Sequence, residues 1–373
     1  MYWKQKLFWW CQILIVILFF GCFSTINVAY AEQNTNTPLK VGFIMVGSAN
    51  DYGWNYAHDQ GRKFLENTLT GKVQTTFAEN ISESAEVERV MEKMIAQGNK
   101  LIFSTSYGYL EPVLRVAARH PDVIFMQCSR PNPQPMKNVG TYSAHFYDVA
   151  YATGVVAGHM TKKNKIGFVA AHPIPVVLLC LNAFTLGARS VNHKAKTYVI
   201  WTNNWNDAPT EAEAAKSFID QGVDVLGTLV SAPAAVVKTA EKNHIYVVCD
   251  NVDLQRLAPT CWLTGSYWDW RDLYVTITKS VLNHTWKPEN KRYSAKDGVI
   301  KLSSFGPAVP KTVQQEATNL MHQIADGKFT TFRGPMKDRD GNLRIPAGKT
   351  ADDRYLETID WVVPGVEGTL PKK

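Results

Sequence analysis

The chain has 373 residues, of which 45% are hydrophobic and 20% are charged, and its formal net charge is +7. This is the composition of an ordinary globular protein long enough for two hydrophobic cores, so disordered and fibrous classes are excluded. The basic residues are scattered and are not interleaved with aromatic residues in a stripe, which argues against a nucleic-acid partner.

The first 31 residues have the layout of a signal peptide. Lys4 and Lys6 precede an apolar run over 7–23, which is short against the roughly 20 residues of a bilayer-spanning helix. Ala29-Tyr-Ala31 follows, with the small residues that signal peptidase requires. We expect cleavage after Ala31, a periplasmic location and a mature net charge of +5, because the removed segment carries two lysines and no acid. The alternative is a lipid anchor at Cys22.

Four cysteines remain in the mature chain, at Cys128, Cys180, Cys249 and Cys261. The first three lie within or end apolar runs, so we expect buried free thiols, with a disulfide between Cys249 and Cys261 as the alternative. The sequence has no CxxC motif, and its nine histidines are dispersed without a partner at metal-ligand spacing. It therefore predicts no metal site and no cofactor.

From residue 40 onward, short β-rich runs alternate with amphipathic stretches, which is typical of βαβ units. We expect strands at 41–46, 101–104 and 122–127. A helix is expected over 86–97, because its apolar residues recur at spacings of three and four and Gly98 follows. The fold class is therefore α/β, with doubly wound parallel sheets.

Three short segments recur in the same order at offsets of 122 to 125 residues. The matched pairs are 40–44 with 165–169, 95–98 with 219–222, and 122–125 with 244–247. Matches that keep their order and spacing predict two α/β lobes built to one plan.

A ligand site is expected between these lobes, because crevices in open parallel sheets form at the carboxyl ends of the strands. The loops at those ends are 47–55, 105–109, 170–175, 202–209, 230–233 and 250–253. Trp54, Trp205 and Trp268 bring indole rings towards this cleft, and aromatic faces stack on planar ligands. Asp250, at a strand end, could accept hydrogen bonds from a sugar hydroxyl or a ring N–H; an Asx turn or helix cap is the alternative.

Catalysis finds little support in the sequence. The chain contains no GxxxxGK[ST], GxSxG or HExxH motif. We expect a protein that is not an enzyme. An enzyme acting on nucleosides stays as an alternative, although it would need more clustered carboxylates than Asp250 and Asp253 supply.

An ordered set of segments resembles one known family. These segments are 51–55, 147–161, 165–175, 183–187, 332–335, 340–342 and 361–366. Together they resemble the basic membrane protein family of ABC-transporter solute-binding proteins, which is related to bacterial purine nucleoside receptors. The resemblance covers nearly the whole mature chain.

The resemblance implies a type I periplasmic-binding fold whose two lobes are joined by a three-crossing hinge. It places residues 39–143 and 268–305 in the N-terminal lobe, and 144–265 and 306–373 in the C-terminal lobe. It further implies a monomer that closes on a purine and is recognised by an ABC permease in the inner membrane. A ligand-sensing subunit of a membrane receptor is the alternative, because it would use the same cleft.

The resemblance also implies which residues bind the ligand. Carried over by position, they are Asp51, Trp54, Asn55, Tyr107, Trp205, Asp250 and Trp268. Trp54 and Trp205 supply the rings that hold the base, and Asp250 engages a ribose. Trp268 stands where nucleoside-binding relatives often have a lysine, which removes a charged contact to hydroxyls. We therefore expect a free nucleobase such as adenine to bind better than its nucleoside.

Overall fold

The computed structural model describes residues 37–370. The predicted signal peptide, its cleavage after Ala31 and the alternative anchor at Cys22 lie outside the described residues. None of the helices within 37–370 combines the length and the apolar character that crossing a bilayer requires.

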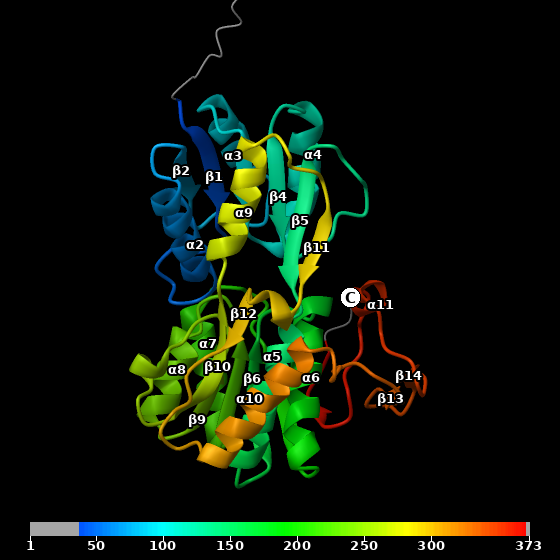
Figure 1. Ribbon diagram of the computed structural model, residues 1–373. Helices are drawn as coiled ribbons and strands as arrows, with labels where there is room; N and C mark the ends of the chain where they lie inside the picture. Colours follow the sequence, from blue (N-terminus) through cyan, green and yellow to red (C-terminus); the bar gives the residue numbers. More distant parts are fainter. Residues whose placement is uncertain (1–36, 371–373) are drawn as a thin grey trace, which may run out of the picture. The chain divides into compact units, whose positions relative to one another are not determined.

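The first lobe is built on a six-stranded parallel sheet within the described part of the chain, with the order β11-β5-β4-β3-β1-β2 (Figure 1). Its strands are β1 (Leu39–Ile44), β2 (Val73–Ala78), β3 (Leu101–Ser104), β4 (Ile124–Cys128), β5 (Val139–Ala144) and β11 (Asn290–Tyr293). Its helices are α2 (Trp54–Thr68), α3 (Glu86–Ala96), α4 (Leu110–Arg119) and α9 (Arg271–Leu282). The strands and the helix expected over 41–127 are confirmed to within two residues at each boundary.

Both faces of this sheet are covered because successive strand residues point to opposite sides. Phe43 of β1 packs in the same core as Leu65 of α2 and Tyr274 of α9. The next residue, Ile44, packs instead with Met91 of α3 and with α4. The alternation within one strand therefore places α2 and α9 on one face and α3 and α4 on the other.

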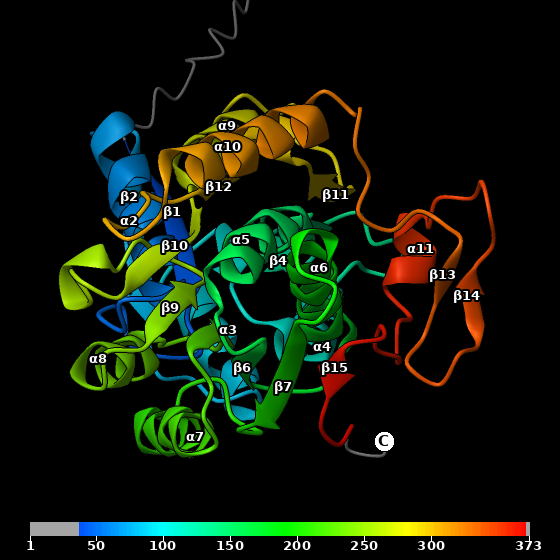
Figure 2. The ribbon, with the colours of Figure 1, turned by 90° about the horizontal axis from the view of Figure 1, so that it is seen from below.

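The second lobe is built on a seven-stranded sheet, in the order β12-β10-β9-β8-β6-β7-β15. Its strands are β6 (Lys165–Ala170), β7 (Lys196–Trp201), β8 (Val225–Leu229), β9 (Tyr246–Cys249), β10 (Trp262–Trp268), β12 (Ile300–Leu302) and β15 (Val366–Glu367). The strands pair in parallel, except that β12 runs antiparallel to β10. Helices α5 (Phe146–Met160) and α6 (Pro175–Val191) lie on one face and α7 (Ala208–Asp220) and α8 (Ala234–Lys242) on the other (Figure 2).

The two sheets share one strand order over their first five strands. The run β5-β4-β3-β1-β2 of the first lobe corresponds to β10-β9-β8-β6-β7 of the second. Two of the three sequence repeats fall on corresponding strands of these two runs, β1 with β6 and β4 with β9, and the third falls at the ends of the corresponding helices α3 and α7. The prediction of two α/β lobes with one plan is therefore confirmed.

The chain passes between the lobes three times. The crossings join β5 to α5, β10 to α9, and β11 to β12. The predicted lobe boundary at residue 305 would leave β12 in the first lobe, whereas β12 pairs with β10 in the second sheet. A strand of three residues carries too little periodicity for the sequence to assign it to a sheet.

A C-terminal extension follows α10 (Lys311–Ala325). It contains β13 (Met336–Lys337), β14 (Leu343–Ile345), the short helix α11 (Asp353–Leu356) and β15. Strand β15 joins the second sheet beside β7, and Trp361 is buried in the core of that lobe. The extension is therefore part of the second lobe, and α11 reaches back towards β11 (Figure 1).

The four cysteines within residues 37–370 are free and buried in the structure, including Cys249 and Cys261, so the alternative disulfide is not formed. Burial raises the pKa of the Cys249 thiol well above its usual value, which keeps it protonated and unreactive. Over residues 37–370, no group of three or more His, Cys, Asp or Glu side chains is arranged to hold a metal ion.

Candidate functional site

A small cavity of about 50 Å³ lies between the two lobes. Five of the six loops expected from the sequence contribute to its wall, so the cavity sits at the carboxyl ends of the strands. The first lobe supplies Val46, Trp54, Thr105, Ser106, Tyr107 and Ser129. The second lobe and the hinge supply Phe146, Val176, Val177, Trp205, Leu229, Val230, Ser231, Asn251 and Trp268.

Trp54 is the first residue of α2, and both of its N–H groups are engaged. Its backbone N–H, which has no partner within the helix, donates across the cleft to the carbonyl of Ser231 (2.9 Å). Its indole N–H donates to the carbonyl of Thr105 (2.7 Å). The ring is therefore fixed in orientation, and it offers a ligand an apolar surface.

Behind the cavity wall, three rings form a stack. Trp268 stacks on Trp270 at 4.8 Å between ring centroids, with 6° between the planes. Trp270 stacks in turn on His58 at 4.8 Å and 10°. Trp54 stands edge-on to all three rings, with interplanar angles of 79° to 89°. Burial lowers the pKa of His58 well below its usual value, so this ring is neutral, and its Nδ1 forms a hydrogen bond with the hydroxyl of Tyr274.

Trp205 and Tyr107 line the cavity from opposite lobes. Trp205 lies in the loop between β7 and α7, where its carbonyl accepts the N–H of Ser231 (2.7 Å) and its ring meets His172 edge-on at 5.1 Å. Tyr107 opens a short 3-10 helix after β3, and the guanidinium of Arg130 lies 5.6 Å from its ring centre. Burial raises the pKa of Tyr107, so its hydroxyl stays protonated at neutral pH.

Asp51 and Asn55 lie beside the cavity and not on its wall. The Asp51 carboxylate accepts the backbone N–H groups of Gly53 (2.8 Å), Asn55 (3.1 Å) and Tyr56 (2.9 Å), and so caps the start of α2. The side-chain amide of Asn55 donates to the same carboxylate (2.7 Å). Both residues thus hold the loop that presents Trp54.

Asp250 is buried and is not among the residues of the cavity wall. Its carboxylate accepts a hydrogen bond from the hydroxyl of Ser266 (2.8 Å), and burial raises its pKa to about 7. The structure thus brings Trp54, Tyr107, Trp205 and Trp268 together on the cavity wall, while Asp51, Asn55 and Asp250 lie behind it.

Eleven of the fifteen wall residues were not named as ligand-binding from the sequence, and three of them show why. Phe146 opens α5 at the first hinge crossing and packs against Trp268 at 5.2 Å. Val176 lies in the first turn of α6, where nothing in the local sequence points to a ligand. Asn251 directly follows Asp250, and its place in a loop at a strand end was a signal that could have found it.

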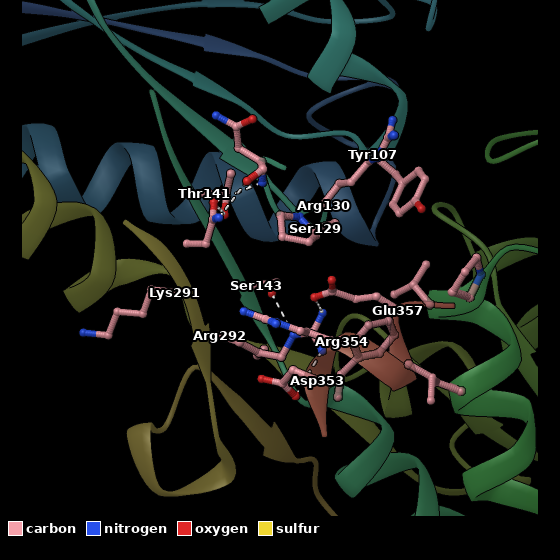
Figure 3. Close-up of a pocket in the computed structure, with 18 of the residues that line it drawn as sticks. Tyr107, Ser129, Arg130, Thr141, Ser143, Lys291, Arg292, Asp353, Arg354 and Glu357 are labelled. Carbon is pink, nitrogen blue, oxygen red and sulfur yellow. Dashed lines mark hydrogen bonds and ion pairs between the residues drawn. The ribbon is translucent and has the colours of Figure 1, made fainter. Parts of the chain in front are cut away.

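A larger, open groove of about 1180 Å³ continues from the cavity. The two share the wall residues Tyr107, Ser129, Phe146, Val176 and Trp268. Charged side chains gather in the groove, among them Arg130, Arg292, Asp353, Arg354 and Glu357 (Figure 3). Arg292 of β11 donates to Asp353 (3.2 Å) and Glu357 (2.7 Å), at α11 and the residue that follows it, and so joins the first lobe to the C-terminal extension.

The fold and the cavity between its lobes are those of a protein that binds a small molecule. The chain belongs to the Bmp family, because the family model for PnrA-like ABC transporter substrate-binding proteins matches residues 39–330. It is 39% identical to a purine-binding protein of Brucella abortus, over 93% of this chain and 97% of that protein. It is 30% identical to a putative ABC transporter glucose-binding protein of Haloferax volcanii, over 89% and 81%.

The fold itself is shared with solved structures. An ABC transporter solute-binding protein from Aeropyrum pernix K1 superposes with a TM-score of 0.69 at 18% sequence identity, covering 80% of this chain and 94% of that one. The expected family and fold class are thus confirmed. Proteins of this family bind a small molecule and work with an ABC permease.

Proposed function

We propose that this protein captures a purine nucleobase, with adenine favoured, and delivers it to an ABC permease of the inner membrane. The observation that carries the proposal is the cavity wall, in which Trp54, Trp205 and Trp268 converge from both lobes on one small apolar space. Flat aromatic faces bind flat heterocycles through stacking, and the exposed surface of this wall is mostly apolar. The 39% identity to a purine-binding protein supports the same ligand class.

Capture works by closure of the lobes. An open form exposes both halves of the wall, the ligand bridges them, and the closed form is the one that the permease recognises. The hydrogen bond from Trp54 to Ser231 is a contact of the closed form, because its donor and acceptor belong to different lobes.

Three features favour a nucleobase over its nucleoside. The indole of Trp268 fills the wall, and its N–H already donates to Asn251, so it offers nothing to a ribose hydroxyl. Asp250 accepts a hydrogen bond from Ser266 and does not line the cavity. The cavity of about 50 Å³ is smaller than the roughly 150 Å³ that holds benzene, so side chains of the wall must move to admit even a base, and a ribose would need more room still.

We propose further that the protein is cleaved after Ala31 and works as a monomer in the periplasm. Purified mature protein should be unfolded and refolded to remove carried ligand, then tested by thermal shift against adenine, guanine, hypoxanthine, adenosine, glucose and an amino acid. A ligand at 100 times its Kd adds about 2.7 kcal/mol to the free energy of unfolding, which shifts Tm visibly.

We expect the largest shift with adenine. Trp205→Ala should abolish it, whereas Trp201→Ala, which removes a half-buried tryptophan outside the cavity, should retain it. A shift with glucose and none with any purine would overturn the proposed ligand class.

A further inference from the structure

Asn251 occupies an unusual position on the cavity wall. It lies in the loop after β9, it is buried, and its backbone φ is +81°. Asparagine adopts this left-handed region more readily than most residues, and such conformations persist where the surroundings hold them in place. We propose that Asn251 is the positioning residue that sets the preference for a nucleobase over a nucleoside; the inference rests on the function proposed above.

The first step is the contact with Trp268. The Asn251 side-chain oxygen accepts the indole N–H of Trp268 (3.0 Å), and its backbone carbonyl accepts the Trp268 backbone N–H (3.2 Å). The far face of the Trp268 ring is already covered by Trp270. The stack allows the ring to slide in its own plane, and the two hydrogen bonds to Asn251 remove that freedom.

The second step is the contact with the neighbouring loop. The Asn251 side-chain amide donates to the carbonyl of Val230 (2.6 Å). The next residue, Ser231, is the one whose carbonyl accepts the backbone N–H of Trp54 from the other lobe. One side chain therefore ties the ring that excludes a ribose to the loop that meets the first lobe.

The two ends of the amide thus have separable tasks. The oxygen holds Trp268 and controls which ligand fits, whereas the amide nitrogen holds the Val230 loop and supports binding of any ligand. A carboxylate at this position can hold Trp268 but cannot hold the Val230 loop, because it accepts the indole N–H but has no hydrogen to donate to the Val230 carbonyl.

The test uses Asn251→Gly and Asn251→Asp in the full mature chain. Glycine and aspartate both tolerate the left-handed backbone conformation at position 251, so neither substitution strains the backbone more than asparagine does. The matched control is Asn164→Gly, because Asn164 also has positive φ (59°) and a side-chain hydrogen bond, to Asn192, but lies in the turn before β6. Affinities for adenine and adenosine are measured by calorimetry.

We expect Asn251→Gly to lower the ratio of adenine affinity to adenosine affinity by about tenfold, the scale of losing one hydrogen bond within a buried wall. Asn251→Asp should weaken the binding of both adenine and adenosine and leave the ratio of their affinities unchanged. In a Trp268→Phe background, which lacks the indole N–H, Asn251→Gly should no longer change the ratio. An unchanged ratio in Asn251→Gly, or a lowered ratio in Asn164→Gly, overturns the inference.

A second measurement needs no ligand. The indole N–H resonance of Trp268, identified by its loss in Trp268→Phe, should exchange slowly with solvent in the parent protein and Asn251→Asp, and rapidly in Asn251→Gly. Slow exchange in Asn251→Gly would overturn the positioning role. If no purine binds the parent protein, the proposed function fails, and this resonance still decides whether Asn251 holds Trp268.

Discussion

The backbone N–H of Trp54 and the carbonyl of Ser231 form a hydrogen bond of 2.9 Å that joins the two lobes at the cavity. Its donor is one of the free N–H groups at the start of α2, and its acceptor belongs to the loop after β8. In the closure mechanism that we propose, this contact satisfies a polar group at a helix end, in addition to enclosing a ligand. The residue before Trp54 makes this contact testable.

A Cβ added at Gly53 would lie 1.8 Å from the Ser231 oxygen and 2.8 Å from Cδ of Pro233. Gly53→Ala should therefore leave each lobe folded and prevent the lobes from meeting. We expect the affinity for adenine to fall by more than tenfold, and small-angle scattering with saturating adenine to show the larger radius of the open form.

Ser231→Ala is the control for this variant, because it keeps the backbone carbonyl that accepts the hydrogen bond. It should close on adenine as the parent protein does. Compaction of Gly53→Ala by adenine to the same radius as the parent protein would show that the contact is not part of closure.

Trp268→Ala should shift the ligand preference from adenine towards adenosine. Base stacking on an aromatic ring contributes about 1 to 3 kcal/mol, so the affinity for adenine should fall by roughly tenfold or more. Adenosine should lose less affinity, because the indole that occupies the space for a ribose is gone. Calorimetry with both ligands measures this shift.

The control is Trp286→Ala, which truncates a half-buried tryptophan of the first lobe outside the cavity and should leave both affinities unchanged. Equal losses of affinity for adenine and adenosine in Trp268→Ala would argue against a selective role of Trp268.

Asp250 makes stability depend on pH. Its pKa is near 3.9 in an unfolded chain and is raised to about 7 in the folded protein, so folding favours its protonated form. The stability that this form contributes is fully present below about pH 4 and is lost as the pH rises to 7. Asp250→Asn removes the titration, so its free energy of unfolding relative to the parent should rise by up to about 4 kcal/mol between pH 4 and pH 8.

Urea unfolding of both proteins across this pH range measures the difference. Glu211 and Asp148 also have raised pKa values, of about 7 and about 6, but both are present in parent and variant and cancel in the comparison. Parallel pH profiles for the two proteins would mean that Asp250 titrates as an exposed carboxyl.

Arg292 links the first lobe to the C-terminal extension through Glu357 and Asp353, and its side chain is 15% exposed. Arg292→Gln should weaken adenine binding about three- to tenfold, because the closed form loses a partly buried ion pair. Lys196→Gln removes an exposed pair with Glu367 inside the second lobe and should have no effect. Affinity at low and high salt provides the measurement: equal affinity of the parent and Arg292→Gln at low salt would exclude a role in closure.

The fold could be predicted from the sequence because its signals are local and repeated. The strand of 101–104 matches β3 and the helix of 86–97 matches α3 to within one residue, since buried apolar runs and helical periodicity are properties of short segments. The repeats predicted two lobes because each matched pair falls on corresponding elements of the two lobes, two pairs on strands and one at the ends of α3 and α7.

The site could be predicted only in part. Three residues that line the cavity, Trp54, Trp205 and Trp268, could be placed there because aromatic residues in loops at strand ends are visible in the sequence, and Tyr107 could be placed there from the family resemblance. Whether a polar side chain faces the ligand or the protein depends on partners distant in the chain. Asp250 turns to Ser266, sixteen residues away, and no local pattern records that choice.

The most direct test of the account is calorimetric titration of refolded mature protein with adenine, adenosine and glucose. The account predicts one site per chain, adenine bound more tightly than adenosine, and no heat with glucose. A demonstrably folded protein that binds glucose and neither purine would contradict it.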